Sequence, residues 1–294
     1  MLILFYDTLW NAPLEMVALP PGYEITADRR QYHKANAVVF HLPQWKWQPR
    51  FFLPKKMPEQ IWVAWSMECQ ENYPRLKDEN FMRAFDLTMT YQLDADVPAL
   101  YFDGRVQDIV RTLKEPPQPK TARAPVVAFV SSRINSSGRR EYMRELMRHV
   151  EIDSYGKFLN NARLAKDRWR ATKLDTIARY KFTLAFENAI ARDYVTEKFF
   201  DPLLRGSVPI YLGAPNVETF APGDKCYLNV NDFESPRALA AYVQFLARDA
   251  DAYNEYFAWK QKPFRPAFRE LTERYGEPPQ VRLCRAVAAR LSAR

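Results

Sequence analysis

Short continuous apolar runs alternate with stretches in which apolar residues recur at helical spacing, and this alternation extends over most of the chain. Runs of this kind are typical of buried strands, whereas Tyr142, Leu146 and Val150 share one face of a predicted helix. The runs predicted as strands are residues 3–7, 37–42, 61–67, 85–91, 126–130, 151–155, 182–186 and 207–212. Strands that alternate with helices predict the α/β class, with parallel sheets covered by helices.

A proline-rich segment, residues 115–125, separates the two halves of this pattern and is the best linker candidate. We predict a first domain over residues 1–118, a second over 119–278, and a C-terminal amphipathic helix over 279–294. Residues 281–291 of that helix combine basic and apolar positions. This pattern fits packing against the protein's own surface, which we favour, and also peripheral contact with an anionic (inner) membrane.

The composition removes several function classes. With only 8 glycines, the chain has neither G-x-G-x-x-G nor a G-x-x-x-x-G-K-[ST] phosphate loop, and it lacks H-E-x-x-H and G-x-S-x-G. The three cysteines are far apart and odd in number, which argues against a disulfide framework and for a reducing compartment, by default the cytoplasm. No apolar stretch reaches the roughly 18 uncharged residues of a membrane span, and the first residues lack a signal-peptide pattern.

A net charge of +8 predicts an anionic partner, and a nucleotide diphosphate, nucleic acid and acidic lipid would all fit. Nucleic acid is suggested by a basic and aromatic segment that contains Trp45-Lys46-Trp47 and Lys55-Lys56. We prefer the interpretation that these aromatic residues belong to the core or stack on a sugar, because they flank predicted strands. Nucleic acid is therefore not an expected partner.

Polar residues directly after the strands are the first candidates for a site, because ligands of parallel sheets bind outside the carboxyl ends of the strands. In the second half of the chain these residues are Ser131-Ser132, Tyr155-Gly156, Glu187-Asn188 and Gly213. A helix start is predicted at Thr196-Glu197-Lys198, with Thr196 as the N-cap. Its free N–H groups and the lysine favour an anion, although such a tripeptide is more often an ordinary surface helix start.

Four motifs in the second half of the chain resemble, in order and in spacing, the donor-binding core of glycosyltransferase family 10, the α-1,3/4-fucosyltransferases. They are Tyr180-Lys181-Phe182, Phe186-Glu187-Asn188, Tyr194-Val195-Thr196-Glu197-Lys198 and Val208-Pro209-Ile210-Tyr211-Leu212-Gly213. The resemblance is weaker before about residue 126. It implies the GT-B arrangement of two Rossmann-like domains facing a cleft, with the acceptor on the N-terminal domain and the GDP-sugar on the C-terminal one.

The resemblance also implies donor-binding positions, which in this chain are Asn188, Tyr194, Glu197 and Lys198. An arginine that meets the diphosphate in the family is matched by Arg139, with Arg140 as the alternative. Ser131 and Tyr155 complete the set of donor-binding candidates, because each follows a predicted strand.

The general base is expected from the first domain. A similar strand in the family ends in a glutamate proposed as the base, and here strand 61–67 is followed by Glu68. Glu71 is the alternative, because Cys69-Gln70 replaces the usual Ser-Pro. The resemblance implies an inverting transfer in which the base takes the acceptor proton while Lys198, Arg139 and the helix start stabilise departing GDP.

No metal or other cofactor is expected besides GDP-fucose as co-substrate. The pairs Asp94–Asp96 and Asp249–Asp251 have D-x-D spacing, but the first lies in the predicted acceptor domain. The second lies on a predicted helix, where side chains two positions apart point in different directions. Pro202 falls where the helix after Lys198 should continue. Proline there would bend or restart the helix, and we expect a local kink.

The acceptor implied by the resemblance is an N-acetyllactosamine-type glycan, fucosylated on O3 of GlcNAc to give a Lewis-X-like product. Donor choice depends on few contacts, so another GDP-sugar, GDP-mannose first among them, is the alternative donor.

Overall fold

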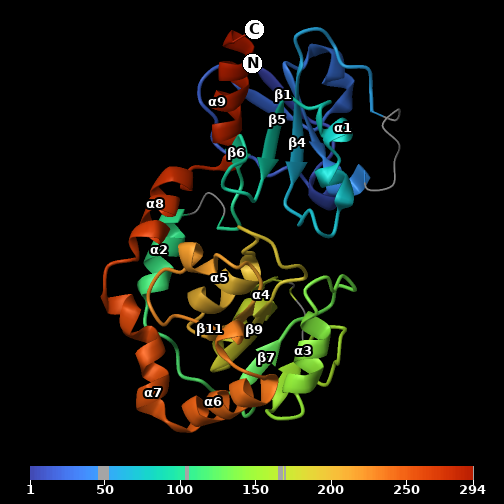
Figure 1. The fold of residues 1–294 in the computed structure, drawn as a ribbon. Helices are drawn as coiled ribbons and strands as arrows, with labels where there is room; N and C mark the ends of the chain where they lie inside the picture. Colours follow the sequence, from blue (N-terminus) through green and yellow to red (C-terminus); the bar gives the residue numbers. More distant parts are fainter. Residues whose placement is uncertain (46–52, 103–105, 165–167, 169, 294) are drawn as a thin grey trace. The chain divides into compact units, whose positions relative to one another are not determined.

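The computed structural model describes residues 1–294 except 46–52, 103–105, 165–167, 169 and 294, and it contains two parallel β-sheets (Figure 1). The chain divides into two compact units. Unit 1 comprises residues 1–105 and 274–294, and unit 2 comprises residues 106–273. The proline-rich segment 115–125 thus lies within unit 2, where Lys260 donates a hydrogen bond to the Leu113 carbonyl just before it.

Unit 1 is built on a six-stranded sheet in the order β2-β1-β3-β4-β5-β6, in which every pair is parallel. Its strands are β1 (Leu2–Phe5), β2 (Glu24–Thr26), β3 (Ala37–His41), β4 (Ile61–Ser66), β5 (Leu87–Thr90) and β6 (Val97–Pro98). The four predicted strands of this half are confirmed. The short β2 and β6 lie at the sheet edges and were not predicted.

One face of this sheet packs against the short helices η2 (Arg29–Lys34) and α1 (Glu79–Met82). Trp45 and Trp62 are buried on that face, which confirms the interpretation that these tryptophans belong to the core. Lys46, Trp47 and residues 50–52 of the aromatic segment lie outside the described residues.

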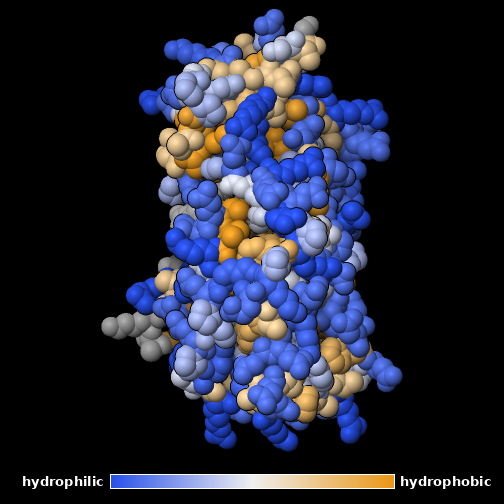
Figure 2. All heavy atoms as spheres, turned by 90° about the vertical axis from the view of Figure 1, so that its left-hand side faces the viewer, coloured by the Kyte–Doolittle hydropathy of each residue, from blue (hydrophilic) through white to orange (hydrophobic). Residues whose placement is uncertain are grey.

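The other face is covered by the C-terminal helix α9 (Pro279–Ser292), which contacts β4 and β6. Leu283, Cys284 and Val287 are fully buried in the same cluster as Ile3 and Val63. The helix therefore packs on the protein itself, as favoured from the sequence, and these side chains are not available to a membrane surface. Figure 2, which views the side of Figure 1 where α9 is labelled, shows a mostly hydrophilic surface with apolar residues in separate patches.

Unit 2 contains a five-stranded parallel sheet in the order β11-β10-β9-β7-β8. Its strands are β7 (Val126–Ala128), β8 (Ile152–Ser154), β9 (Phe182–Phe186), β10 (Val208–Leu212) and β11 (Leu228–Asn229). Its helices are α2 (Val106–Lys114), α3 (Arg139–Leu146), α4 (Arg170–Ala178), α5 (Glu197–Leu204), α6 (Pro236–Arg248), α7 (Ala250–Asn254) and most of α8 (Pro266–Tyr275). The four predicted strands are confirmed here too.

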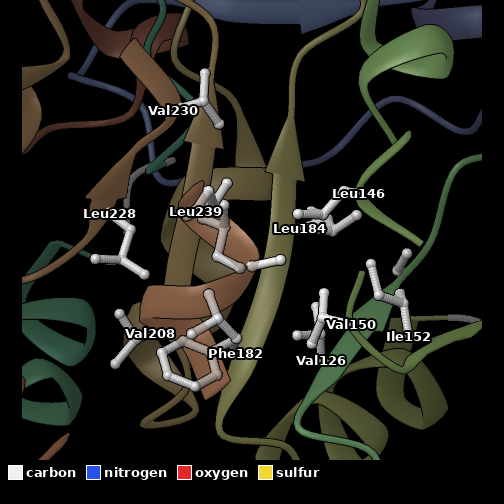
Figure 3. Packing of buried hydrophobic residues seen from close by; sticks show 14 of the residues in the cluster. Val126, Leu146, Val150, Ile152, Phe182, Leu184, Val208, Leu228, Val230 and Leu239 are labelled. Atoms are coloured by element: carbon white, nitrogen blue, oxygen red, sulfur yellow. The ribbon is translucent and has the colours of Figure 1, made fainter. Parts of the chain in front are cut away.

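The largest core cluster of unit 2 lies between the sheet and helices α3 and α6. Leu146 and Leu239 reach it from these helices, and Leu184 reaches it from β9 (Figure 3). The predicted start of α6 is confirmed, because the Ser235 hydroxyl accepts a hydrogen bond from the Ala238 amide at 3.2 Å. No helix among the described residues is both long and apolar enough to cross a bilayer.

Strand order places a switch point in each sheet. From β7 the chain proceeds to β8 on one side, whereas β9, β10 and β11 lie on the other side. In unit 1, β1 is flanked in the same way by β2 and β3. Loops on the two sides of such a point diverge and leave room for a ligand at the carboxyl ends of the strands. The candidate site residues follow these strand ends.

The packing of α9 generates a stability prediction. We expect Leu283→Ala to lower the free energy of unfolding of unit 1 by about 3 kcal/mol, because it leaves a cavity among fully buried side chains. Arg290→Ala, an exposed position on the same helix, is the matched control and should change the stability by less than about 0.5 kcal/mol. Urea unfolding followed by circular dichroism measures the stability of both variants. Equal unfolding midpoints for Leu283→Ala and Arg290→Ala would show that α9 does not complete this core.

Candidate functional site

A buried glutamate joins the end of β9 to the start of α5. Glu187 follows β9 directly and is fully buried. Its two carboxylate oxygens accept hydrogen bonds from the Thr196 amide (2.8 Å) and the Thr196 hydroxyl (2.9 Å). Thr196 is also the N-cap of α5, as predicted, and its hydroxyl accepts from the Lys198 amide at 3.3 Å. The strand end therefore fixes where the helix begins.

Lys198 lies at the centre of this arrangement. Its Nζ is 3.2 Å from Glu187 Oε2 and 3.3 Å from Glu197 Oε1, and it donates to the Thr196 hydroxyl at 2.9 Å. Burial alone would lower the pKa of Lys198, but the two carboxylates raise it to about 12, so the ammonium stays charged. Partial burial would raise the pKa of Glu197, but Lys198 and Lys173 hold it below the usual carboxyl value.

The pKa of Glu187 is shifted in the opposite direction. Burial raises it, and the neighbouring Lys198 charge offsets part of that effect. From the sequence, Glu187 was expected only as one of the polar residues that follow strands, with no role assigned to it. The signal in the sequence was a carboxylate directly after a mostly apolar strand, a position where an unpaired charge would be strongly destabilising.

Arg139, the first residue of α3, is buried at the switch point between β7 and β9. Its NH1 group donates to the Phe186 carbonyl at 3.1 Å, and its NH2 group donates to the Ile134 carbonyl at 3.2 Å. Its Nε is buried with no hydrogen-bond partner among the described residues. The guanidinium thus braces the loop after β7 against the end of β9. Arg140, the alternative, is half-buried and lies over the Phe158 ring, 4.7 Å from its centroid.

Asn188 and Tyr194 are both buried in the segment that connects β9 to α5. The Asn188 carbonyl accepts from the Ser137 amide, and the Tyr194 carbonyl accepts from the Tyr211 hydroxyl at 3.4 Å. Gly213 is required by this packing, since a Cβ there would lie 2.4 Å from the Tyr211 hydroxyl and 2.7 Å from Glu187 Cγ. Arg139, Asn188, Tyr194, Glu197 and Lys198 are therefore gathered around one strand end.

Two donor-binding candidates have other contacts. The hydroxyl of Tyr155 is 3.0 Å from that of Tyr180, and its ring stacks on Phe129, in a cluster on the α4 side of the sheet. Ser131 is exposed, and its hydroxyl accepts from the Lys157 amide at 3.1 Å. The structure thus uses Tyr155 in packing and Ser131 in holding the loop that follows β8.

The helix behind the site continues through its proline. The helix does not restart at Pro202: α5 is one helix from Glu197 to Leu204, with Pro202 in its second turn. The local kink stays a prediction. Pro202 leaves one backbone donor missing in this short helix, and the residue before it anchors the helix. The buried Asp201 carboxylate pairs with Arg170 and Lys173, each at 2.9 Å.

The candidate base lies in unit 1, after β4. Glu68 is half-buried, and the Ser66 hydroxyl accepts from its amide at 3.1 Å. Burial and, next, the charge of Glu68 raise the pKa of Tyr73 to about 12, so these two side chains are close. Glu71, the alternative, is exposed and pairs with Lys77 at 2.5 Å.

One residue of each D-x-D pair has a local structural role. Asp96 accepts hydrogen bonds from the amide and hydroxyl of Thr88, at 2.7 and 2.8 Å. Asp249 is the N-cap of α7 and accepts from the Ala252 amide at 2.9 Å. Within the described ranges, no group of three or more His, Cys, Asp or Glu residues is placed to hold a metal.

The Glu187–Lys198 pair generates a testable prediction. We expect Lys198→Met to destabilise the protein by about 3 kcal/mol, because it leaves the Glu187 charge buried without its cation. Adding Glu187→Gln should recover part of that loss, since the amide removes the unpaired charge. Urea unfolding of the two single variants and the double variant measures this coupling. Strictly additive effects would show that the two charges do not interact.

Comparison with known proteins identifies the family of this chain. Residues 119–293 match the family model "Glycosyltransferase family 10 (fucosyltransferase) C-term", and residues 3–102 match "Fucosyltransferase, N-terminal". A fucosyltransferase-like protein of Arabidopsis thaliana is 36% identical over 80% of this chain, which spans 44% of that relative. The 4-galactosyl-N-acetylglucosaminide 3-alpha-L-fucosyltransferase FUT6 of Homo sapiens is 35% identical over 88% of this chain and 73% of its own length.

The fold is similar to that of a solved α1,3-fucosyltransferase with GDP-fucose, with a TM-score of 0.60 and 15% identity over 92% of this chain and 81% of the other. The predicted α/β class of the GT-B glycosyltransferases, with two parallel sheets, is confirmed. Since the two family models together match nearly the whole sequence, the chain belongs to glycosyltransferase family 10, the fucosyltransferases.

Proposed function

We propose that the protein transfers L-fucose from GDP-β-L-fucose to a hydroxyl of a glycan acceptor, with inversion at the sugar carbon. The observation that carries this proposal is the paired Lys198 at the start of α5, beside Glu197 and the end of β9. A relative's solved structure with GDP-fucose supports the choice of donor.

On the donor side, the diphosphate leaving group gains negative charge as the glycosidic bond breaks. The first N–H groups of α5 and the ammonium of Lys198 supply positive charge at one fixed place, and Glu187 and Thr196 hold both in position before the donor binds. Glu197 is half-exposed and ionised, so it can accept hydrogen bonds from sugar or ribose hydroxyls. Arg139 adds a second cation behind the same strand end.

We assign the remaining donor contacts to Asn188 and Tyr194, and we keep Ser131, Tyr155 and Arg140 as secondary candidates. On the acceptor side, Glu68 removes the proton from the attacking hydroxyl, on the face of the sugar opposite the leaving group, and Glu71 is the alternative base. The charges that stabilise the departing diphosphate are side chains and backbone N–H groups, so we propose a transfer that proceeds in the absence of a divalent metal.

The acceptor that we propose is an N-acetyllactosamine-type glycan modified on O3 of GlcNAc. Support comes from the human relative FUT6, which is a 4-galactosyl-N-acetylglucosaminide 3-alpha-L-fucosyltransferase. Three free, buried cysteines fit a reducing compartment, and we place the protein in the cytoplasm. GDP-mannose remains the alternative donor to be tested, because few contacts select the sugar.

The proposal predicts the behaviour of three variants in an assay of GDP release from GDP-fucose, with and without N-acetyllactosamine, in EDTA. Glu68→Gln should lower kcat by roughly 10²–10⁴-fold, because the acceptor proton has no base. Lys198→Ala should lower kcat by about 10²-fold through loss of charge at the leaving group. Glu71→Gln is the matched control and should retain activity.

Each outcome has a distinct meaning. Loss of activity in Glu71→Gln with retention in Glu68→Gln would transfer the role of base to Glu71. Turnover with GDP-mannose but not with GDP-fucose would overturn the choice of donor. Abolition of turnover by EDTA would overturn the metal-free mechanism, and thermal unfolding of every variant separates these effects from loss of the fold.

A further inference from the structure

A strained and exposed tryptophan lies at the carboxyl end of the unit 1 sheet. Trp10 is in the loop after β1, and 49% of its surface is exposed. Its φ angle is +50°, and that of the next residue, Asn11, is +62°. Asparagine tolerates this left-handed region, but for a bulky side chain it costs about 1–2 kcal/mol. Strain of this kind persists only where the surroundings impose it, and such residues cluster at ligand sites.

Contacts with neighbouring residues hold Trp10 and Asn11 in this conformation. Asn11 Oδ1 accepts a hydrogen bond from Gln44 Nε2 at 3.0 Å, and Gln44 Oε1 is 2.6 Å from His41 Nδ1. The Trp10 ring stands edge-to-face on the His41 ring, with centroids 5.2 Å apart and an interplanar angle of 87°. A chain of three polar side chains therefore ties the loop after β1 to the end of β3.

Two buried polar atoms near the indole have no hydrogen-bond partner among the described residues. His41 is fully buried and pairs in register with Trp65 of β4, and their rings are 5.0 Å apart. Neither His41 Nε2 nor Trp65 Nε1 has a hydrogen-bond partner among the residues that the structure describes. Burial lowers the pKa of His41, so its imidazole is neutral. Unpaired polar atoms at more than nine-tenths burial are rare in folded proteins and need a reason.

This cluster adjoins the candidate base. The ring centroids of Trp10 and Tyr73 are 6.5 Å apart, and Tyr73 is the residue whose pKa responds to the charge of Glu68. Trp10 follows β1, His41 is the last residue of β3, and Glu68 follows β4. These three strands are consecutive neighbours in the sheet. They therefore gather at the same carboxyl edge, within unit 1 alone.

We propose that Trp10 is the platform on which a neutral pyranose ring of the acceptor stacks, beside Glu68, and that it determines acceptor affinity. This inference rests on the proposed function. A pyranose presents C–H groups on one face and hydroxyls around its rim, and an indole offers a flat apolar surface with a polar edge. The contacts of Asn11 and His41 hold the loop in its strained conformation, in which the indole stays exposed. His41 holds the loop from below, through Gln44 and through its ring contact with Trp10.

The test compares Trp10→Gly and Trp10→Phe with Phe245→Ala, a control residue in unit 2 that is also 49% exposed. Trp10→Gly should lower kcat/KM for N-acetyllactosamine by about tenfold or more, mainly through KM, while the Kd for GDP-fucose stays unchanged. Its thermal midpoint should stay within about 3 °C of wild type, since glycine adopts a positive φ without strain. Trp10→Phe keeps an aromatic face and should retain part of the affinity, and Phe245→Ala should match wild type.

Equal acceptor kinetics in Trp10→Gly and Phe245→Ala would overturn the inference while leaving the transfer reaction intact. A raised Kd for GDP-fucose in Trp10→Gly, with acceptor KM unchanged, would also overturn it and would place the donor there instead. If the wild type transfers no fucose, the proposed function fails, and the platform is tested by NMR titration with N-acetyllactosamine alone. Binding lost in Trp10→Gly supports the platform, whereas equal or absent binding in both proteins overturns it.

Discussion

The start of helix α5 is built around a carboxylate that water does not reach. Glu187 is fully buried, and its two oxygens are used by the amide and hydroxyl of Thr196 and by the ammonium of Lys198. A charge in that position is tolerated only with all of these partners present. The same contacts that satisfy Glu187 therefore fix the N-cap, the direction of the first N–H groups and the place of the lysine charge. The electrostatic part of the proposed donor site is therefore formed before any ligand arrives.

The surrounding residues are arranged to keep this interaction intact. Arg139 braces the neighbouring loop through backbone carbonyls, and Gly213 leaves room for the Glu187 side chain. Asp201, one turn along α5, is buried against Arg170 and Lys173. Lys173 also contributes to the low pKa of Glu197, so the anchoring of the helix and the charge of the site are electrostatically linked.

The strands and the helix starts could be predicted because their signals are local. The runs at β9 and β10, the Ser235 cap and the Thr196 cap all depend on residues within one turn or one strand. The positions of α9 and Arg139 could not be predicted in the same way. An amphipathic helix can pack on any apolar surface, so its sequence does not say which one. That α9 packs on the sheet of unit 1 becomes visible only when the strands, which are far apart in the sequence, are paired. The positive φ of Trp10 likewise depends on Gln44 and His41, more than thirty residues away.

The return of α9 to unit 1 has a consequence for synthesis. Unit 2 is one continuous segment, so it can fold as soon as residue 273 has left the ribosome. Unit 1 begins to emerge first, but one face of its sheet stays uncovered until residues 279–292 are released. Although unit 1 emerges first, its core is therefore completed only after the whole of unit 2 has been synthesised. During that interval the apolar residues of β1, β3 and β4 that α9 later covers are exposed and can aggregate. A chaperone that binds nascent apolar segments would therefore stay bound longest to the first part of the sequence.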